Sequence, residues 1–295
     1  MHRVSFLALL FLIGCAGGGG GGHVPEDPTV SATNRQAPRR LRVLTYNIHH
    51  GEGTDGRIDL ERIARVIRAA DADLVALQEV DRHTRRSGGV DQAAVIAEAL
   101  GYEHAFVTAI EFDGGQYGEA VLSRVPASAP RGIPLRRRVP EEEDRAAIEL
   151  VTQPWGEELN SVRFIGTHLS HESDRTRTEQ AVALKTSLES DPIPAILAGD
   201  FNCVQGSTPY QLILEGWLDG ARKYAADQDR GRARPTFPSE RPEKRIDYIF
   251  LRPKHRWRVL SAEVIDERVA SDHCPLLLEL ELLPFDGNLW GGIGE

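Results

Sequence analysis

Several short apolar runs in this sequence end at an Asn, Glu, Asp or His, and this recurring pattern constrains the fold more than any other feature. The clearest run, 195–198, reads as a buried strand, and Gly199 then indicates a turn before Asp200 and Asn202. Alternate residues of an extended chain face the same side, so Asp200 and Asn202 are expected to share one face. A single strand that ends at Asp is common; the repetition of the pattern is what indicates a site.

Further strands and helices are expected between residues 41 and 283. Apolar spacing predicts helices over 60–70, after a capping Asp59, over 91–100, before a C-capping Gly101, and over 176–189. The strands are expected over 41–46, 74–77, 120–123, 147–151, 162–167, 246–251, 258–265 and 276–282. Polar residues follow these strands and would converge at one sheet edge: Asn47, Glu79, His168, Asp200, Asn202, Asp247, Asp272 and His273.

The strand-end residues comprise carboxylates, amides and imidazoles, and no Ser or Cys nucleophile has a base nearby in the sequence. Carboxylate and amide oxygens suit a hard divalent ion, Mg²⁺ or Mn²⁺, better than zinc. The adjacent His49 and His50 alone make a poor zinc site. Each residue taken singly could equally be structural, and His49 and His171 stay open between a supporting role and a merely polar one.

Composition and charge narrow the range of partners. The chain has 295 residues, 27% charged and 41% hydrophobic, which is typical of a globular α/β protein. Its formal charge of -9 argues against tight, non-specific nucleic-acid binding. A basic loop over 222–245 could override this locally and attract a phosphate-rich substrate. Arg145, Arg175 and Arg177 could contact phosphate, or could only face solvent.

The N-terminal segment is expected to lie outside the fold. Arg3 and the apolar run 4–13 resemble a signal peptide, and the run is too short to span a bilayer. Residues 12–15 resemble the lipobox of bacterial lipoproteins, which implies a signal peptide over 1–14 and a lipid on Cys15. The alternative is an ordinary secretory signal with an incidental Cys. The Gly-rich segment 15–40 would be a flexible tether.

The lipobox resemblance implies an extracytoplasmic protein anchored to the bacterial membrane, and Ala16 after the Cys indicates the outer membrane, on its periplasmic or surface face. The other cysteines, Cys203 and Cys274, are expected to be small buried residues. An oxidising compartment could instead join them.

Six segments in chain order, YNIHHG, LVALQEV, GTHLSH, AGDFN, RIDYIF and SDHCP, together resemble the motif series of the endonuclease/exonuclease/phosphatase superfamily (DNase I-like). The resemblance covers residues 41–283, and the tail over 284–295 is uninformative. It implies an α/β fold, a four-layer αββα sandwich of two mixed β-sheets flanked by helices. It also implies a metal-dependent phosphoesterase that hydrolyses a phosphodiester or phosphomonoester by in-line attack of an activated water.

The resemblance implies a metal site for Mg²⁺ or Mn²⁺. Glu79 would be the principal ligand, and Asn47 would contact the metal or the substrate phosphate. Asp272 matches an additional carboxylate that binds metal or supports a histidine.

The resemblance further implies the catalytic groups. Asp200 would orient or deprotonate the attacking water, and Asn202 would hold that water and a phosphate oxygen. Asp247 would fix the tautomer of His273. His168 would bind the phosphate or protonate the leaving group.

Two positions depart from the family pattern. Glu119 stands where relatives commonly carry Asn, and a carboxylate there could pair with His168 or repel an anionic substrate. His49 stands where AP endonucleases have an acidic metal ligand, which weakens any expectation of abasic-site cleavage.

The substrate is the least constrained prediction. A membrane-tethered location leaves a phospholipid head group, nucleic acid or a small phosphate ester, and no protein partner is implied. A secreted-type nuclease is the alternative among enzymes. The contrasting hypothesis is a non-catalytic family domain that binds a surface partner.

Overall fold

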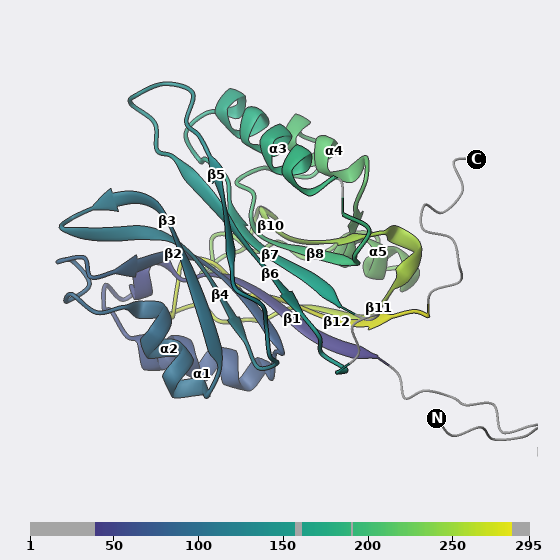
Figure 1. Ribbon diagram of the computed structural model, residues 1–295, viewed down its shortest axis with the longest axis horizontal. Coiled ribbons are helices and arrows are strands. Elements are labelled where there is room, and N and C mark those ends of the chain that lie inside the picture. The colour runs from purple at the N-terminus through teal and green to yellow at the C-terminus, as the bar shows by residue number, and fades with distance from the viewer. Residues whose placement is uncertain (1–38, 157–160, 190, 285–295) are drawn as a thin grey trace, which may run out of the picture. The chain divides into compact units, whose positions relative to one another are not determined.

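Buried apolar strands form the centre of the molecule. The computed structural model describes residues 39–156, 161–189 and 191–284, and within these ranges twelve strands form two six-stranded sheets (Figure 1). The predicted signal peptide, lipid attachment at Cys15 and most of the predicted tether and tail lie outside the described residues. Within them, no helix combines the length and apolar character needed to cross a membrane.

The first sheet has the strand order β11-β12-β1-β2-β4-β3. Only β1 and β2 are parallel neighbours in this sheet, and the other neighbours are antiparallel. Its strands are β1 (Arg40–Asn47), β2 (Leu74–Arg82), β3 (Glu103–Phe112), β4 (Gly115–Ser123), β11 (Trp257–Val264) and β12 (Leu276–Leu282).

The second sheet has the order β5-β6-β7-β8-β10-β9, and here β7 and β8 are the parallel pair. Each sheet is therefore mixed, with one parallel pair inside it. The strands are β5 (Arg131–Leu135), β6 (Arg145–Thr152), β7 (Val162–His168), β8 (Ala195–Asp200), β9 (Leu218–Asp219) and β10 (Asp247–Arg252).

Capping residues mark the ends of the first two helices. Asp59 caps α1 (Leu60–Ala70) by accepting from the Arg62 amide, and α2 (Gln92–Leu100) ends at Gly101 in the left-handed conformation, both as predicted. The other helices are α3 (Asp174–Leu188), α4 (Thr208–Leu214), α5 (Gly220–Asp227) and the short 3₁₀ turns η1 (His49–Gly51) and η3 (Lys254–Arg256).

In the part of the chain that the structure describes, three apolar clusters hold the layers together. The inner faces of the two sheets pack against each other through side chains such as Val43, Val121 and Phe164. Ile63 of α1 lies in the cluster on the outer face of the first sheet, and Leu184 of α3 lies in the cluster on the outer face of the second. The predicted four-layer αββα sandwich is thus confirmed.

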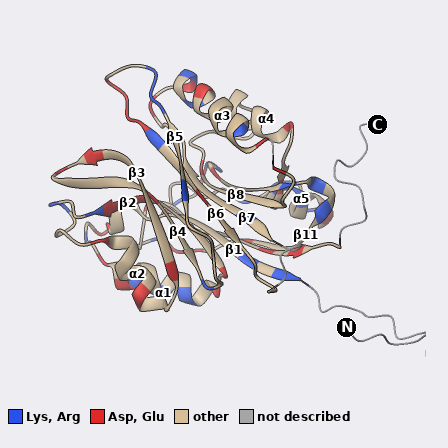
Figure 2. Cartoon of the chain, in the orientation of Figure 1, with Lys and Arg blue, Asp and Glu red and all other residues tan. Residues whose placement is uncertain are grey.

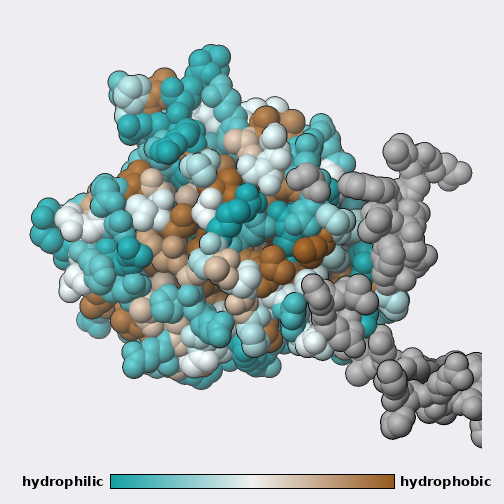
Figure 3. All heavy atoms as spheres, in the orientation of Figure 1, coloured by the Kyte–Doolittle hydropathy of each residue, from teal (hydrophilic) through white to brown (hydrophobic). Residues whose placement is uncertain are grey.

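Figure 1 shows these layers, with α1 and α2 below the sheets and α3 and α4 above them. On the face seen in Figure 3, hydrophobic residues are concentrated in a band across the middle, and hydrophilic residues cover most of the periphery.

Several elements differ from the prediction. The expected loop over 126–134 contains β5, which accommodates Pro134 because an edge strand has no partner for one row of its backbone groups. The strand β3 escaped prediction because its residues are exposed or half-buried throughout, with no alternation. Two elements that were not predicted, α4 and β9, precede the basic segment 222–245, and α5, capped by Asp219, overlaps its start.

Candidate active site

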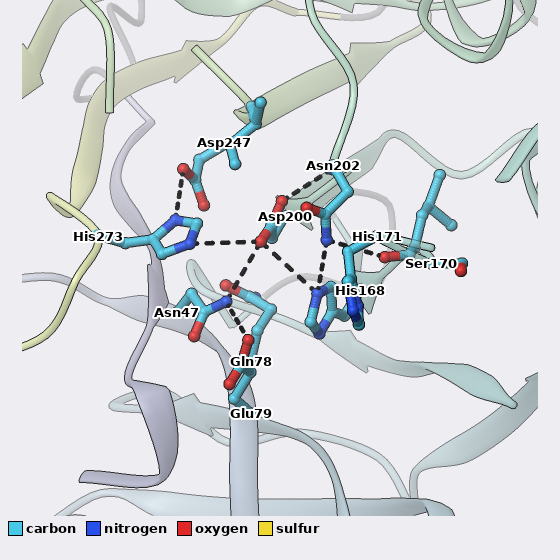
Figure 4. Close-up of polar contacts among 12 residues, drawn as sticks. Asn47, Gln78, Glu79, His168, Ser170, His171, Asp200, Asn202, Asp247 and His273 are labelled. Atoms are coloured by element: carbon cyan, nitrogen blue, oxygen red, sulfur yellow. Dashed lines mark hydrogen bonds and ion pairs between the residues drawn. The ribbon is translucent and has the colours of Figure 1, made fainter. Parts of the chain in front are cut away.

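The predicted site residues meet where the two parallel strand pairs end. Asn47 is the last residue of β1, His168 of β7 and Asp200 of β8, whereas Asp247 is the first residue of β10. The register places His168 and Asp247 on either side of Asp200. His273 comes from the β11–β12 connection. Residues that are more than two hundred positions apart therefore face one another (Figure 4).

Asp200 lies at the centre of this cluster and is buried. Its Oδ1 accepts a hydrogen bond from the backbone amide of Asn202 at 2.8 Å, and its Oδ2 accepts one from the side-chain Nδ2 of Asn47 at 3.2 Å. The same Oδ2 is 3.6 Å from Nε2 of both His168 and His273. Burial and the nearby Asp247 carboxylate raise the pKa of Asp200 to about 7, although His273 opposes the rise. A carboxylate with that pKa can accept a proton near neutral pH.

Gly199 does not turn the chain as predicted, because it lies inside β8. The lack of a side chain at Gly199 allows the backbone of β8 to lie close to β7, its parallel neighbour. A Cβ added at Gly199 would lie 2.0 Å from the carbonyl oxygen of Thr167. The glycine therefore lets β7 and β8 pack closely enough to bring His168 beside Asp200.

His273 and Asp247 form a buried pair, with Nδ1 of the histidine 3.0 Å from Asp247 Oδ2. Burial alone would lower the pKa of His273, but Asp247 and Asp200 outweigh it and raise that pKa to about 10. His273 is therefore an imidazolium at neutral pH. The ring also packs against Phe237, with centroids 4.8 Å apart.

His168 has the opposite electrostatic environment. Burial, followed by the positive charge of Arg145, lowers its pKa well below the usual value, so the ring is neutral. Asn202 Nδ2 lies 2.9 Å from His168 Nε2 and donates at 3.0 Å to the Leu169 carbonyl. If the amide donates to Nε2 as well, the His168 proton resides on Nδ1. The predicted role of His168 as phosphate ligand or leaving-group acid stays a prediction.

Glu79 is displaced from the regular strand. The register of β2 shifts between Leu77 and Val80, and Glu79 has a positive φ of 59°. This bulge re-aims the Glu79 side chain, and β2 continues past it to Arg82, beyond the predicted end. Asn47 Nδ2 donates to Glu79 Oε1 at 3.0 Å as well as to Asp200, so this amide bridges two carboxylates.

Asp272 is placed differently from the other predicted residues. Its Oδ1 accepts from Ser271 Oγ at 3.4 Å. Among the described residues, no hydrogen bond or ion pair joins Asp272 to Glu79 or Asn47. Its role as a further metal ligand stays a prediction.

Glu119 is fully buried behind His168, and neither of its carboxylate oxygens has a hydrogen-bond partner among the described residues. Its Oε1 is 3.9 Å from His168 Nδ1, which is too long for a hydrogen bond. Burial raises the pKa of Glu119 well above the usual value, against the opposing effect of Arg145. Burial therefore favours the neutral form of the Glu119 carboxyl group, and its role toward His168 or an anionic substrate stays a prediction.

A cavity of about 190 Å³ opens beside Glu79. The sequence left the roles of Arg145 and His171 open and did not reveal the aromatic residues Phe112 and Tyr117, because β3 and the first part of β4 were not predicted. Arg145 is buried, its Nη2 lies 3.2 Å from His171 Nδ1, and its guanidinium lies over Tyr117. The cavity is lined by His49, His50, Glu79, Arg86, Ile110, Phe112, Tyr117, Glu143, Arg145 and His171.

The other two candidate phosphate-binding arginines differ from Arg145. Arg177 is buried and donates to the carbonyl oxygens of Ser170 and Asn202, so it holds the loop that carries Asn202. Arg175 is exposed on α3, where it lies near Glu179.

Charged side chains of the basic segment over 222–245 form ion pairs within the protein. Arg245 forms a buried ion pair with Asp219, and Lys223 pairs with Asp227 along α5. Figure 2 shows blue and red residues together at α5. The segment nevertheless supports the site, because Thr236 Oγ1 accepts from the Asp247 amide at 3.4 Å.

Within residues 39–156, 161–189 and 191–284, two clusters of His, Asp and Glu side chains could hold a metal ion. In the cluster of Asp200, Asp247 and His273, the imidazolium and its hydrogen bond to Asp247 disfavour a cation. The cluster of His49, His50 and Glu79 faces the cavity and contains the carboxylate predicted to bind metal. The residues present therefore fit a divalent ion at Glu79.

The buried cysteines are both unpaired, in agreement with the prediction that they are small buried residues. Burial raises the pKa of each thiol to about 11, so neither is a reactive thiolate at neutral pH.

Comparison with known proteins agrees with this geometry. The sequence model of the Endonuclease/Exonuclease/phosphatase family matches residues 44–273. YbhP of Escherichia coli K12 is 25% identical over 251 residues, which is 82% of this chain and 96% of YbhP.

Two solved structures resemble the chain closely. An endonuclease/exonuclease/phosphatase from Beutenbergia cavernae DSM 12333 is 28% identical, with a TM-score of 0.64 over 83% of this chain and 72% of that one. An endonuclease/exonuclease/phosphatase family protein from Bacteroides thetaiotaomicron is 21% identical, with a TM-score of 0.70 over 87% of this chain and 99% of that one.

Proposed function

Because this chain belongs to the endonuclease/exonuclease/phosphatase family, whose members are phosphate ester hydrolases, we propose that it hydrolyses a phosphodiester or phosphomonoester with a divalent metal ion, Mg²⁺ or Mn²⁺. The observation that carries the proposal is the position of Asp200, which contacts a protonated His273 on one side and the Asn47–Glu79 pair on the other. A base, a cationic donor and a metal-binding carboxylate thus surround one point.

Each side chain has a defined task in this reaction. Asp200 accepts a proton from the attacking water, since its pKa of about 7 leaves a useful fraction ionised. The side-chain Oδ1 of Asn202 can accept a hydrogen bond from that water, since Nδ2 donates to the Leu169 carbonyl and lies 2.9 Å from His168 Nε2. The imidazolium of His273 donates a hydrogen bond to a phosphoryl oxygen, where negative charge develops. Asp247 keeps the His273 ring protonated.

Glu79 would hold the metal ion, with Asn47 fixing the position of its carboxylate. A bound divalent ion acts as a Lewis acid that offsets charge on the phosphoryl oxygens. Arg145 and His171 line the adjacent cavity and can contact the rest of the substrate.

We further propose that the enzyme works outside the cytoplasm as a lipoprotein tethered through Cys15. The lipobox-like sequence 12–15 and the Gly-rich segment after it support this. A membrane-proximal enzyme would meet phospholipid head groups, extracellular nucleic acid or small phosphate esters.

Hydrolysis of bis-p-nitrophenyl phosphate by the full-length chain tests the proposal. We expect turnover that requires a divalent ion and is lost by at least about 10²-fold in His273→Ala and Asp200→Asn. His104→Ala, which changes an exposed histidine of β3, is the matched control and should retain wild-type turnover. A panel of p-nitrophenyl phosphate, sphingomyelin and plasmid DNA would then assign the substrate class.

A wild-type chain that is as inactive as His273→Ala on every ester of this panel would contradict the proposal. That result would favour the alternative, a non-catalytic family domain that binds a surface partner.

A further inference from the structure

The turn η1 brings a second type of donor to the predicted metal site. We propose that His49, His50 and Glu79 together bind the divalent ion, so that the site selects a first-row transition metal such as Mn²⁺ over Mg²⁺. The inference rests on the proposed function and specifies the cofactor of the same site.

The three side chains are close enough to share one ion. One potential ligand atom from each lies within 4.8 Å of the others. His49 and His50 have positive φ angles of 46° and 44°, so the backbone curls at both residues. Their rings are 4.5 Å apart in an edge-to-face arrangement. Adjacent histidines, a poor metal site by sequence alone, thus gain a carboxylate from β2.

Glu52 contacts one ring nitrogen of each histidine. His49 Nδ1 lies 3.2 Å from the Glu52 carbonyl oxygen, and His50 Nε2 lies 3.4 Å from the Glu52 carboxylate. Metal-binding histidines commonly donate their second N–H to a backbone carbonyl or a carboxylate, which fixes the tautomer and orients the ring. Here both kinds of partner come from one residue.

This arrangement leaves one nitrogen on each ring available to a metal. His50 Nδ1 is buried and has no hydrogen-bond partner within the described part of the chain. His49 Nε2 makes no hydrogen bond there either. The simpler interpretation, that His50 only pairs with Glu52, leaves its buried Nδ1 unexplained, and a buried polar atom without a partner is unfavourable.

The cluster faces the cavity that would admit substrate. His49, His50 and Glu79 all line it, together with Arg145 and His171. Three protein ligands beside an open cavity leave coordination positions for substrate or water, as in other catalytic metal sites. Imidazole ligands favour transition metals, whereas an all-oxygen site suits Mg²⁺. Two imidazoles beside one carboxylate therefore shift the preference away from Mg²⁺.

Metal binding can be measured independently of catalysis. The full-length chain, freed of metal by a chelator, would be titrated with Co²⁺ and with Mg²⁺ by calorimetry, and the visible absorption of bound Co²⁺ would be recorded. We expect binding of Co²⁺ at least about 10²-fold tighter than that of Mg²⁺. His49→Asn and His50→Asn should each weaken Co²⁺ binding at least tenfold and change its spectrum. Glu52→Ala should weaken it by about 10–100-fold.

His104→Asn is the matched control and should leave Co²⁺ binding unchanged. Pulsed electron paramagnetic resonance of Mn²⁺ bound to the unmutated chain reports coupled nitrogens directly, so a variant that fails to fold does not leave the question open. Nitrogen coupling to Mn²⁺ supports the proposal, and its absence overturns it.

The proposal is also overturned if both histidine variants bind Co²⁺ like the wild type while Glu79→Ala does not bind it. Hydrolysis with Mg²⁺ in that case would leave the proposed function intact. Conversely, nitrogen-ligated Mn²⁺ without hydrolysis of any ester would keep the metal site and remove the function.

Discussion

The substitution Asp247→Asn tests how the buried charges of the site cooperate. In the wild type, the pKa of His273 is raised to about 10 from an ordinary 6.5. That difference corresponds to about 5 kcal/mol in favour of the imidazolium. Asp247 supplies the largest favourable charge interaction and also the hydrogen bond at 3.0 Å. Its loss should therefore lower the pKa of His273 by about 2, or roughly 3 kcal/mol.

The same substitution also affects Asp200. The Asp247 carboxylate raises the pKa of Asp200, so removing that charge lowers it. In the proposed reaction the active form needs Asp200 ionised and His273 protonated, which predicts a rate that rises through pH 7 and falls through pH 10 in the wild type. In Asp247→Asn both limbs of the profile should move to lower pH. The maximum rate should also fall, by about 10²-fold, because the imidazole loses its fixed orientation.

Two measurements check this prediction. The ring carbons of His273, followed by nuclear magnetic resonance in the metal-free chain, give its pKa directly. The dependence of kcat/KM on pH gives both limbs, because it reports the groups of the free enzyme. Asp227→Asn, which removes a surface partner of Lys223, is the control. An alkaline limb that stays near pH 10, or moves upward, would refute the reasoning.

Four further outcomes are expected. Gly199→Ala should lower the free energy of unfolding by about 3 kcal/mol in urea titrations, because its Cβ would overlap the Thr167 carbonyl. Gly216→Ala, where the added Cβ meets nothing within 4 Å, should change it by less than about 0.5 kcal/mol, and equal losses would contradict the steric argument. Glu149→Gln should cost about 3–5 kcal/mol because it removes the nearer ion-pair partner of buried Arg163 and leaves only Asp191, at 3.6 Å, whereas Glu179→Gln on the surface should cost less than about 1 kcal/mol. Mn²⁺ at a hundred times its Kd should stabilise the fold by about 2.7 kcal/mol, seen as a rise in Tm that Glu79→Ala abolishes. Glu119→Gln should leave the dependence of rate on pH around neutrality unchanged, since burial favours the protonated form of the Glu119 carboxyl group; a shifted profile would show that it carries charge.

The strands that carry the motifs were predictable from the sequence because they are strongly apolar, whereas the four-layer arrangement was implied by the resemblance of those motifs to the family. Runs such as 74–77 and 195–198 are buried on both faces, and a continuous apolar run is typical of such a strand. The predicted convergence of Asp200, His273 and Asn47 followed from their positions next to apolar strands that were expected to share one sheet edge. What the strands alone could not reveal is the exposed edge strand β3, whose half-buried residues carry no periodic signal.

The details of the site depended on backbone geometry that residue patterns do not encode. The bulge at Glu79 and the two left-handed histidines are local departures from regular structure. These departures determine which ring nitrogens of His49 and His50 lie near the carboxylate oxygens of Glu79. The protonation of Glu119 likewise depends on burial that becomes complete only when both sheets are packed.

The site straddles the boundary between the two sheets, with Asn47 and Glu79 on one and Asp200 and His168 on the other. No hydrogen-bonded ladder joins the described strands of the two sheets, so the distance between the sheets is set by apolar packing. Val121 packs against Gly166, for example, where an added Cβ would lie 3.0 Å from Val121 Cγ1. Catalytic alignment is therefore a property of the interior rather than of the cleft alone. A single methyl group introduced at that interface could misalign the reacting groups while every one of them remained in place on its own strand.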